Sequence, residues 1–339
     1  VITLIGPMTV PRAAHSATLL PDGRVLLAGG CTRNSCELGE EGATAELYDP
    51  ELGRFSHTGS MARPRVGHAA VLVEGRVLVL GGWDLGGVTA SAELYDPATG
   101  IFSGAGSMRS RRGGFTATRL RDGTVLIAGG YDGGRYLSSA ELYDPRTGRF
   151  VPTGRMVLPR TSHVAALLPD GRVLVAGGST REGKVIASAE VYDPSTGKFS
   201  RTGNMTVARH KHGAARLPGG RILIVGGSDA RDIRGRYASA EVYDPETGRF
   251  AATGEMATAR FKLPDALAAL PDGDVLVAGG GETAEAYDPG AGGFRVVEGS
   301  LGSDWSFATA TVLRDGRVLI AGGYDGSIQL TARSWLYGQ

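Results

Sequence analysis

One nine-residue phrase occurs seven times in the sequence, and each copy ends in a glycine doublet. Successive doublets lie 52, 48, 48, 49, 53 and 43 residues apart. A period of about 50 residues indicates a repeat architecture in which each unit buries its apolar faces only against its neighbours. The copies are DGRVLLAGG (22–30), EGRVLVLGG (74–82), DGTVLIAGG (122–130), DGRVLVAGG (170–178), GGRILIVGG (219–227), DGDVLVAGG (272–280) and DGRVLIAGG (315–323).

Each repeat is expected to form four short antiparallel strands. The first, for example 163–168, ends in a Pro-Asp-Gly type of turn, where glycine supplies the positive φ of a tight hairpin. The second, for example 173–176, is a continuous apolar run, which indicates that both of its faces are covered. The third ends at a Tyr-Asp-Pro phrase, and a turn leads to the fourth, which carries a phenylalanine. No segment shows a sustained 3.6-residue period, so we expect very little helix.

The glycine doublet with a tyrosine downstream resembles the kelch repeat, and the resemblance covers essentially the whole chain. The tyrosine follows six doublets, at Tyr48, Tyr95, Tyr143, Tyr192, Tyr243 and Tyr287. The resemblance implies an all-β fold, a seven-bladed β-propeller of four-stranded antiparallel blades, in which radial closure removes exposed sheet edges. We expect residues 1–339 to form this single domain.

The two ends of the chain are expected to complete one blade together. The last repeat has its first three strands but no fourth. Residues 2–8 align with 55–61, which hold the fourth strand of another repeat. We therefore predict that residues 1–8 supply the outer strand of blade seven, which begins near Asp304, and that this strand locks the ring.

Charge and hydropathy narrow the range of partners. The chain has 36 Lys and Arg against 35 Asp and Glu, whereas a nucleic-acid-binding protein normally carries a basic patch or stripe. No apolar run approaches the ~18 residues of a membrane helix. We expect no nucleic-acid partner, no membrane insertion and a monomer.

Two charged positions recur in six of the seven repeats and are missing from the same repeat. We interpret them as a buried structural ion pair, because a charge buried alone is costly. The exceptional repeat has Trp305 in place of the arginine and, by our alignment, Arg333 in place of the glutamate. The charged residues are Arg12, Arg65, Arg112, Arg160, Arg209 and Arg260, with Glu46, Glu93, Glu141, Glu190, Glu241 and Glu285.

A histidine recurs at a third position, which raises the question of a metal site. It is present as His15, His68, His163 and His212, and the other repeats hold Phe115, Asp265 and Ala308 there. A propeller spreads equivalent positions around its axis instead of gathering them. We therefore interpret these histidines as packing or hydrogen-bonding residues, and we predict no metal site and no cofactor.

Ligand-binding residues are expected where the repeat is broken, because the fold does not require them there. The departures gather in the loops from each fourth strand to the next first strand, and from second to third strands. Both sets of loops open on one face, which we call the loop face. Aromatic residues interleaved with basic and acidic ones suit a peptide or a glycan. The candidates are Trp83, Arg111, Phe115, Tyr131, His210, Lys211, Phe261, Lys262, Asp265, Asp304, Trp305 and Tyr324.

The two cysteines of the chain, Cys31 and Cys36, lie in one loop. Two cysteines cannot complete a zinc site without other ligands, so we predict a local disulfide, which implies an oxidising compartment. The chain begins at Val1 without a signal-peptide pattern, as in a processed or trimmed chain. We expect a secreted or periplasmic protein.

Two classes of function are open. The first is a binding module that recognises a peptide or a glycan on the loop face, and we favour it. The second is an enzyme, since kelch propellers include copper radical oxidases similar to galactose oxidase and a sialic-acid epimerase. The copper enzymes need a Tyr–Cys crosslink, a second tyrosine and two converging histidines, and this pattern does not match Cys31. An epimerase or lyase would need an acid–base pair, for which Asp265, Asp304, Lys262, His210 and Arg112 could serve.

Overall fold

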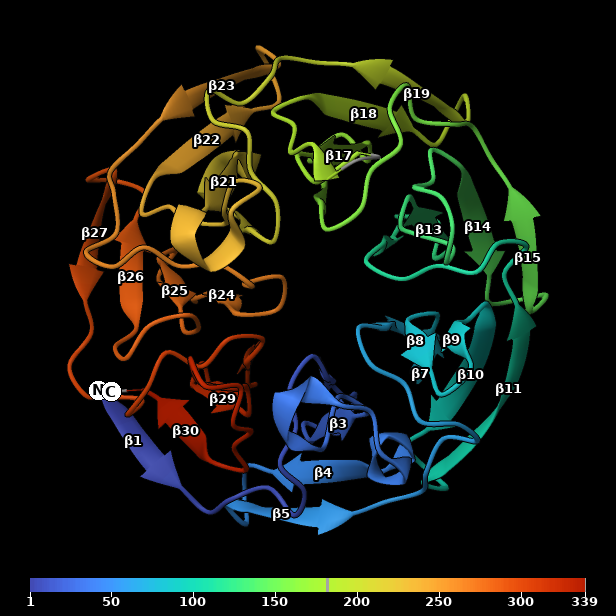
Figure 1. The fold of residues 1–339 in the computed structure, drawn as a ribbon, viewed down its shortest axis with the longest axis vertical. Helices are drawn as coiled ribbons and strands as arrows, with labels where there is room; N and C mark the ends of the chain where they lie inside the picture. The colour runs from blue at the N-terminus through green and yellow to red at the C-terminus, as the bar shows by residue number, and fades with distance from the viewer. Residues whose placement is uncertain (181–182, 339) are drawn as a thin grey trace.

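Seven four-stranded antiparallel sheets surround a central axis (Figure 1). The structure is a computed structural model and describes residues 1–180 and 183–338. Each sheet is one blade, and blade one begins with β2. This arrangement confirms the predicted all-β, seven-bladed propeller.

The strands occupy the same four places in every blade. The innermost strands are β2 (Ser16–Leu19), β6 (Ala69–Val73), β12 (Thr116–Arg119), β16 (Val164–Leu167), β20 (Gly213–Arg216), β24 (Leu267–Ala269) and β28 (Thr309–Val312). The second strands are β3 (Val25–Ala28), β7 (Arg76–Leu80), β13 (Val125–Ala128), β17 (Val173–Ala176), β21 (Ile222–Val225), β25 (Val275–Val277) and β29 (Val318–Ala321). The third strands are β4 (Ala45–Asp49), β10 (Ser91–Asp96), β14 (Ala140–Asp144), β18 (Ala189–Asp193), β22 (Ala240–Asp244), β26 (Glu285–Asp288) and β30 (Ser334–Tyr337). The outermost strands are β5 (Arg54–His57), β11 (Ile101–Ser107), β15 (Arg149–Pro152), β19 (Lys198–Arg201), β23 (Arg249–Ala252), β27 (Gly293–Val296) and β1 (Ile2–Ile5).

Few regular elements lie outside this plan in the described residues. A small hairpin of β8 (Trp83–Asp84) and β9 (Gly87–Val88) extends a loop of blade two. Short 3-10 helices are η1 (Asn34–Cys36), η2 (Glu40–Ala43), η4 (Pro218–Gly220) and η5 (Asp232–Gly235).

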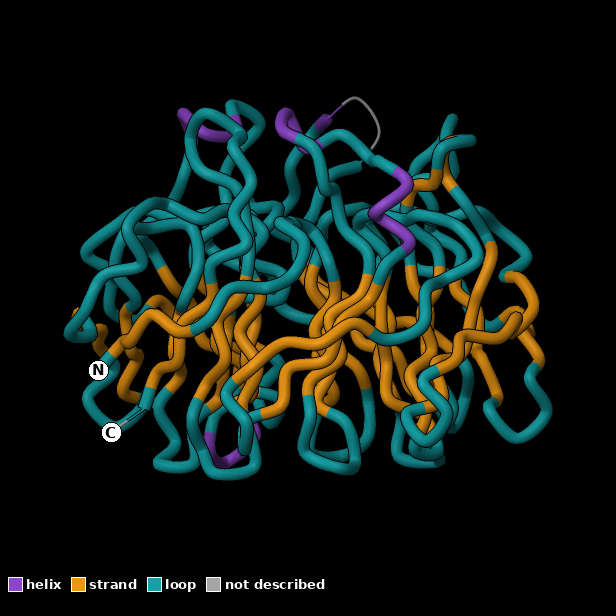
Figure 2. The backbone as a smooth tube through the Cα atoms, turned by 90° about the horizontal axis from the view of Figure 1, so that it is seen from below, coloured by secondary structure: helices purple, strands orange, loops and turns teal. Residues whose placement is uncertain are grey.

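The two faces of the ring differ in their loops (Figure 2). The loops between second and third strands, which carry η1, η2 and η5, stand on the loop face. The opposite face carries the tight turns that join first to second and third to fourth strands, and we call it the turn face. Long and variable loops therefore gather on one side of the molecule, as the sequence predicts.

The N-terminal strand closes blade seven. β1 pairs with β30 in antiparallel register from Ile2↔Tyr337 to Ile5↔Ser334. Met8 donates its backbone N–H to Ala332 at 2.8 Å and is 3 % exposed. The predicted closure is confirmed, because the outer strand of the last blade comes from the first residues of the chain.

The hydrophobic core lies between neighbouring blades. The four residues of β17 are at most 1 % exposed, since blades cover both faces of this strand. Leu126 of blade three and Val175 of blade four belong to one buried cluster. A Tyr–Phe pair between third and outermost strands recurs in six blades at centroid distances of 4.8–4.9 Å. No blade can therefore bury its surface without its neighbours.

The six predicted Arg–Glu pairs are present and buried. Their N–O distances are 2.7–3.1 Å, and no side chain of a pair is more than 8 % exposed. In blade four, Arg160 also donates to the Gly177 carbonyl at 2.9 Å, and Glu190 accepts the Val157 backbone N–H at 2.7 Å. The pair therefore ties the loop that enters a blade to the second and third strands of that blade.

Blade seven replaces the ion pair with two tryptophans. Strand register places Trp335 opposite Ile320, where the other blades have the glutamate. The rings of Trp305 and Trp335 lie 6.2 Å apart, and Trp305 donates its indole N–H to the Leu301 carbonyl at 2.8 Å. The alignment of Arg333 with the glutamate position was wrong by two residues. Both members of the pair have changed together, so neither charge is left buried alone.

Candidate functional site

Seven residues with positive φ encircle the axis on the loop face. Each lies in the loop that leads into an innermost strand, and we call the set the axial ring. Backbone hydrogen bonds join neighbours in the ring, for example from Lys211 to Ser162 at 3.0 Å and from Phe307 to Lys262 at 3.2 Å. The members are Ala14 (φ 50°), Gly67 (φ 59°), Gly114 (φ 62°), Ser162 (φ 53°), Lys211 (φ 53°), Lys262 (φ 59°) and Phe307 (φ 56°).

The axial ring is asymmetric in its side chains. Blades one to four contribute small residues, whereas blades five to seven contribute Lys211, Lys262 and Phe307. Lysine is rare in this chain, with four among the 36 basic residues. Two of those four occupy adjacent places in the ring. The fold requires only the backbone conformation here. Phe307 packs against the apolar cluster that contains Tyr324, so it is the two lysines that folding does not explain.

Lys262 lies among aromatic rings. Its ammonium donates to the Tyr324 hydroxyl at 2.6 Å. It also lies 4.6 Å, 5.0 Å and 5.7 Å from the ring centroids of Phe261, Tyr324 and Phe307, within the range of cation–π attraction. Burial, together with repulsion from Lys211, lowers the pKa of Lys262 to about 8. Burial likewise raises the pKa of Tyr324 to about 12, so this hydroxyl stays protonated.

Lys211 is held by an acidic loop of its own blade. Its ammonium donates to both carboxylate oxygens of Asp232, at 2.8 and 2.9 Å, and Asp232 begins η5. Burial alone would raise the pKa of Asp232, but the hydrogen bonds from Lys211 lower it overall. His210 Nε2 lies 3.2 Å from Asp232, and its Nδ1 lies 3.0 Å from Ser179 Oγ. In Figure 1, η5 is the gold coil between β21 and β24, at the inner side of the ring.

Two further acidic candidates lie beside this cluster. Asp304 is 3.6 Å from the Arg236 guanidinium and accepts the Gly326 backbone N–H at 3.1 Å. Asp265 is solvent-accessible, yet protein surrounds it closely enough to raise its pKa to about 6. The Asp265 backbone carbonyl accepts the Ala310 N–H at 2.8 Å, so its loop is tied to blade seven.

Asp265 does not take the histidine place that the sequence assigned to it. In blade five, the side chain of His212 packs 2.6 Å from the ideal Cβ position of Gly177; in blade six, Leu263 packs 2.9 Å from that of Gly226. The two-residue insertion follows Leu263 and pushes Pro264 and Asp265 out into a turn. Alignment of the repeats by their strands could not show that Asp265 is displaced from the histidine place.

The remaining candidates fall into two groups. Phe261 and Trp305 are 2 % and 7 % exposed and pack inside the scaffold. The others lie over blades two and three, away from Lys262. There, the Trp83 indole packs against Gly67 and Gly113, and Phe115 contacts Gly81 in the histidine place. Arg111 is exposed, and the ring of Tyr131 contacts that of Tyr136 in a tilted arrangement, with the centroids 5.5 Å apart. The structure gathers His210, Lys211, Lys262, Asp304 and Tyr324, with Asp265 at their edge.

Sequence reasoning did not recognise the axial ring or commit to Phe307 and Asp232 as site residues. The signal lies in the residue just before each histidine place, which varies from alanine and glycine to serine, lysine and phenylalanine, although the arginine two residues earlier recurs in six repeats. A variable position close to a recurrent one indicates a place where the scaffold does not require a particular side chain.

The repeated histidines bond between blades, as the sequence suggests. Nε2 of His15, His68 and His163 lies 3.1, 2.9 and 3.0 Å from the hydroxyl that begins the innermost strand of the preceding blade. Burial lowers the pKa of all three. His212 faces Val164 at the equivalent place. Burial, together with the nearby charge of Arg209, lowers the pKa of His212 well below its usual value, and neither ring nitrogen forms a hydrogen bond within the described residues.

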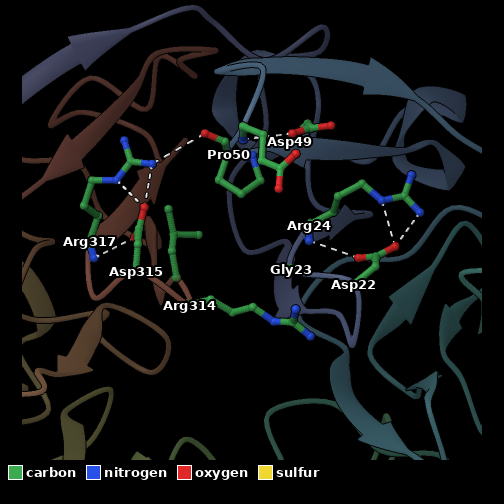
Figure 3. A pocket seen from close by; sticks show the side chains of 10 residues that line it. Asp22, Gly23, Arg24, Asp49, Pro50, Arg314, Asp315 and Arg317 are labelled. Atoms are coloured by element: carbon green, nitrogen blue, oxygen red, sulfur yellow. Dashed lines mark hydrogen bonds and ion pairs between the residues drawn. The ribbon is translucent and has the colours of Figure 1, made fainter.

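The turn face has a pocket of about 460 Å³ between blades seven and one (Figure 3). Two ion pairs lie in its lining, Arg24 with Asp22 at 2.6 Å and Arg317 with Asp315 at 2.7 Å. The same pair recurs in blade four. This pocket is therefore built from the repeat's own turns, and the candidate site lies on the loop face.

Cys31 and Cys36 form the predicted disulfide. Their loop reaches blade seven, because Ser35 donates its backbone N–H to the Ile328 carbonyl at 3.0 Å, and Asn34 accepts that of Leu330 at 3.2 Å. The disulfide fits an oxidising compartment. Within residues 1–180 and 183–338, no helix is long and apolar enough to cross a membrane.

Known proteins share the repeat and the fold. The kelch motif matches residues 64–109, 112–156, 160–206 and 211–256. A fungal alcohol oxidase of the AA5 family, solved in complex with copper, superposes with a TM-score of 0.77 at 17 % identity, covering 100 % of this chain and 75 % of that chain. At this identity the likeness shows the fold alone. A search of curated proteins finds no match.

The residues of this chain do not fit a copper centre. In the part of the chain that the structure describes, no three His, Cys, Asp or Glu side chains are grouped so that they could hold a metal ion. Cys31 is bonded to Cys36, and the repeated histidines are distributed one to a blade. We therefore derive no chemistry through copper.

Proposed function

The chain belongs to the kelch-repeat family, and from this premise we propose that it is a binding module whose loop face recognises a segment of a partner protein. Kelch propellers are commonly protein-binding modules. The observation that carries the proposal is the cluster around Lys262, in which two of the four lysines lie on adjacent places of the axial ring. These side chains are not required by the scaffold and they face the variable loops.

A peptide fits this site better than a glycan. Sugar recognition commonly uses the open face of an aromatic ring as a platform. Every aromatic side chain that the structure describes is buried or half-buried, and the rings near Lys262 already contact its ammonium. What remains accessible is a set of polar and charged groups, which suits the side chains and backbone of a peptide.

Selection of peptides tests the proposal. A phage-displayed library of random dodecapeptides would be selected on the immobilised full chain. We expect selected peptides to lose binding to Lys262→Met and Lys211→Met. Lys198→Met, on the exposed outer strand β19, is the matched control and should bind normally.

The result would contradict the proposal if the selected peptides bound all three variants equally, because the binding surface would then lie elsewhere. Circular dichroism of each variant would show that the fold is retained. A glycan array on the same protein covers the other class of ligand, and glycan binding that depends on Lys262 would replace a peptide by a sugar as the ligand.

An acid–base enzyme is the second candidate. The observation in its favour is that Lys262 and Asp265, three residues apart, both have pKa values shifted towards neutrality, to about 8 and about 6. An epimerase or lyase removes a proton from carbon. Incorporation of solvent deuterium into carboxylate-bearing sugars, lost in Asp265→Asn, would support this function. If no deuterium is incorporated, binding remains the proposed function.

We also propose that the protein works outside the cytosol, secreted or periplasmic. The disulfide supports this location, since local disulfides persist in oxidising compartments. Mass spectrometry of the protein from its native source, alkylated without reduction, should recover residues 31 and 36 in one crosslinked peptide. Two alkylated cysteines would contradict the proposal.

A further inference from the structure

The ammonium of Lys262 has unused donors. A protonated lysine offers three N–H donors, and Tyr324 accepts one of them. Among the described residues, no carboxylate lies within ion-pair distance of Lys262, although it is half-buried. A charge in such a place lacks both full hydration and an anionic partner. The cation–π contacts stabilise the charge only in part.

The nearby carboxylates are already engaged. Asp232 receives both of its short contacts from Lys211, and Asp304 contacts Arg236 and the Gly326 N–H. Asp232 and Asp304 act on Lys262 only at longer range. Aromatic rings therefore surround the Lys262 ammonium, and no carboxylate of the described residues forms an ion pair with it.

We infer that the loop-face site takes a carboxylate, the side chain of an aspartate or glutamate in the partner segment, and pairs it with Lys262. This inference rests on the proposed function, because it names the chemical group that the same site accepts. Lys262 donates to one carboxylate oxygen. Tyr324 accepts from Lys262 and keeps its own O–H free, so it donates to the second oxygen.

The aromatic surroundings favour this pairing over a loose contact. Phe261 and Phe307 exclude water from one side of the ammonium, and an ion pair is stronger where water is excluded. Two charge-assisted hydrogen bonds to one carboxylate also select against a neutral amide, which offers only one oxygen. An uncharged glutamine in the partner should therefore bind more weakly than glutamate.

The pairing links binding to protonation. The groups that face Lys262 are Tyr324, Lys211, Asp232 and Asp304. Tyr324 has a pKa of about 12, so it stays neutral in this pH range. A bound carboxylate stabilises the charged form of Lys262, so the pKa of Lys262 rises from about 8 when the complex forms. Affinity should therefore fall above about pH 8, as free Lys262 loses its proton, and also below about pH 5, where the ligand carboxylate is protonated.

Lysine-selective NMR tests the inference on the full chain. Protein labelled with ¹³C at Lys Cε has four lysine signals, assigned by single Lys→Met variants, and the chemical shift reports the protonation of each amine. Glutarate is the probe and neutral glutaramide is the control. We expect glutarate to shift the Lys262 signal saturably at pH 7 and to raise the pKa of Lys262 by about one unit, equal to about tenfold tighter binding of the protonated form.

Two controls distinguish binding at Lys262 from a general effect of salt. Lys184 and Lys198 are exposed and should respond only to ionic strength. Tyr324→Phe keeps the ring and removes the second donor, so it should weaken glutarate binding about fivefold, a typical loss for one hydrogen bond. The inference is overturned if glutaramide shifts Lys262 as much as glutarate does, or if glutarate shifts Lys198 equally.

The two proposals fail in different ways. If glutarate leaves Lys262 unchanged while selected peptides still need Lys262 and Lys211, the carboxylate inference fails and loop-face binding stands. If glutarate binds at Lys262 but selected peptides ignore both substitutions, the carboxylate site stands and the proposed function fails.

Discussion

Replacing Val164 by threonine should stabilise the propeller. His15, His68 and His163 each meet a hydroxyl on the preceding blade, whereas His212 meets Val164, and neither of its ring nitrogens has a hydrogen-bond partner among the described residues. Threonine has the shape of valine, and Thr116 shows the required geometry, with its Oγ1 3.0 Å from His163 Nε2. The substitution would give His212 the partner that its counterparts have.

The expected gain is about 1 kcal/mol. Satisfying a buried unpaired polar group recovers about 1–3 kcal/mol, and exchanging a buried methyl for a hydroxyl removes about 1 kcal/mol of apolar burial. With an unfolding entropy of about 2.1 cal/mol/K per residue over 339 residues, 1 kcal/mol corresponds to a rise in Tm of about 1.5 °C.

A double-mutant cycle separates this hydrogen bond from other effects. Val164→Thr would be measured by chemical denaturation and calorimetry in the wild type and in His212→Phe, since Phe115 already occupies the histidine place in blade three. In the phenylalanine background, threonine has no ring nitrogen to meet and should destabilise by about 1 kcal/mol. A coupling energy near zero would refute the reasoning, whatever the sign of the single change. Thr116→Val is the reverse test and should destabilise.

Three further outcomes follow from the scaffold. Glu190→Gln leaves Arg160 buried without its counter-charge and should reduce the free energy of unfolding by about 3–5 kcal/mol in a denaturant titration; a loss below 1 kcal/mol would show that the pair is hydrated. Deleting residues 1–8 removes the outer strand of blade seven, and we expect unfolding at markedly lower temperature by calorimetry; an unchanged Tm would contradict closure. Reducing the Cys31–Cys36 bond should speed hydrogen exchange at residues 325–330, which the loop contacts, and exchange confined to blade one would argue against that contact.

Much of the fold follows from local patterns. The apolar run 173–176 predicts β17 to the residue, because a run with turn residues at both ends has little freedom to shift. The joint loss of arginine and glutamate in one repeat predicts their pairing. The place of Trp335 could not be read the same way, because a tryptophan shares no chemistry with the glutamate it replaces and the alignment had nothing to anchor it.

The candidate site was less accessible to sequence reasoning. Lys262 and Tyr324 are 62 residues apart and meet only because blades six and seven are neighbours. Repeat-breaking residues mark the correct face, but the same rule selects Trp305 and Phe261, which replace or support scaffold side chains. Whether an unusual residue points into the core or towards solvent depends on packing that no single repeat contains.

The axial ring has a consequence for evolution and design. Its conformation is held by hydrogen bonds between neighbouring blades, so where space is open a change of side chain can leave the backbone as it is. Gly67 and Gly114 are blocked, since a Cβ would lie 2.9 Å from Trp83 and 2.4 Å from Thr161. The other five places already hold alanine, serine, lysine and phenylalanine. Such a propeller can acquire a new ligand specificity by single substitutions in the axial ring, while the backbone around the axis stays the same.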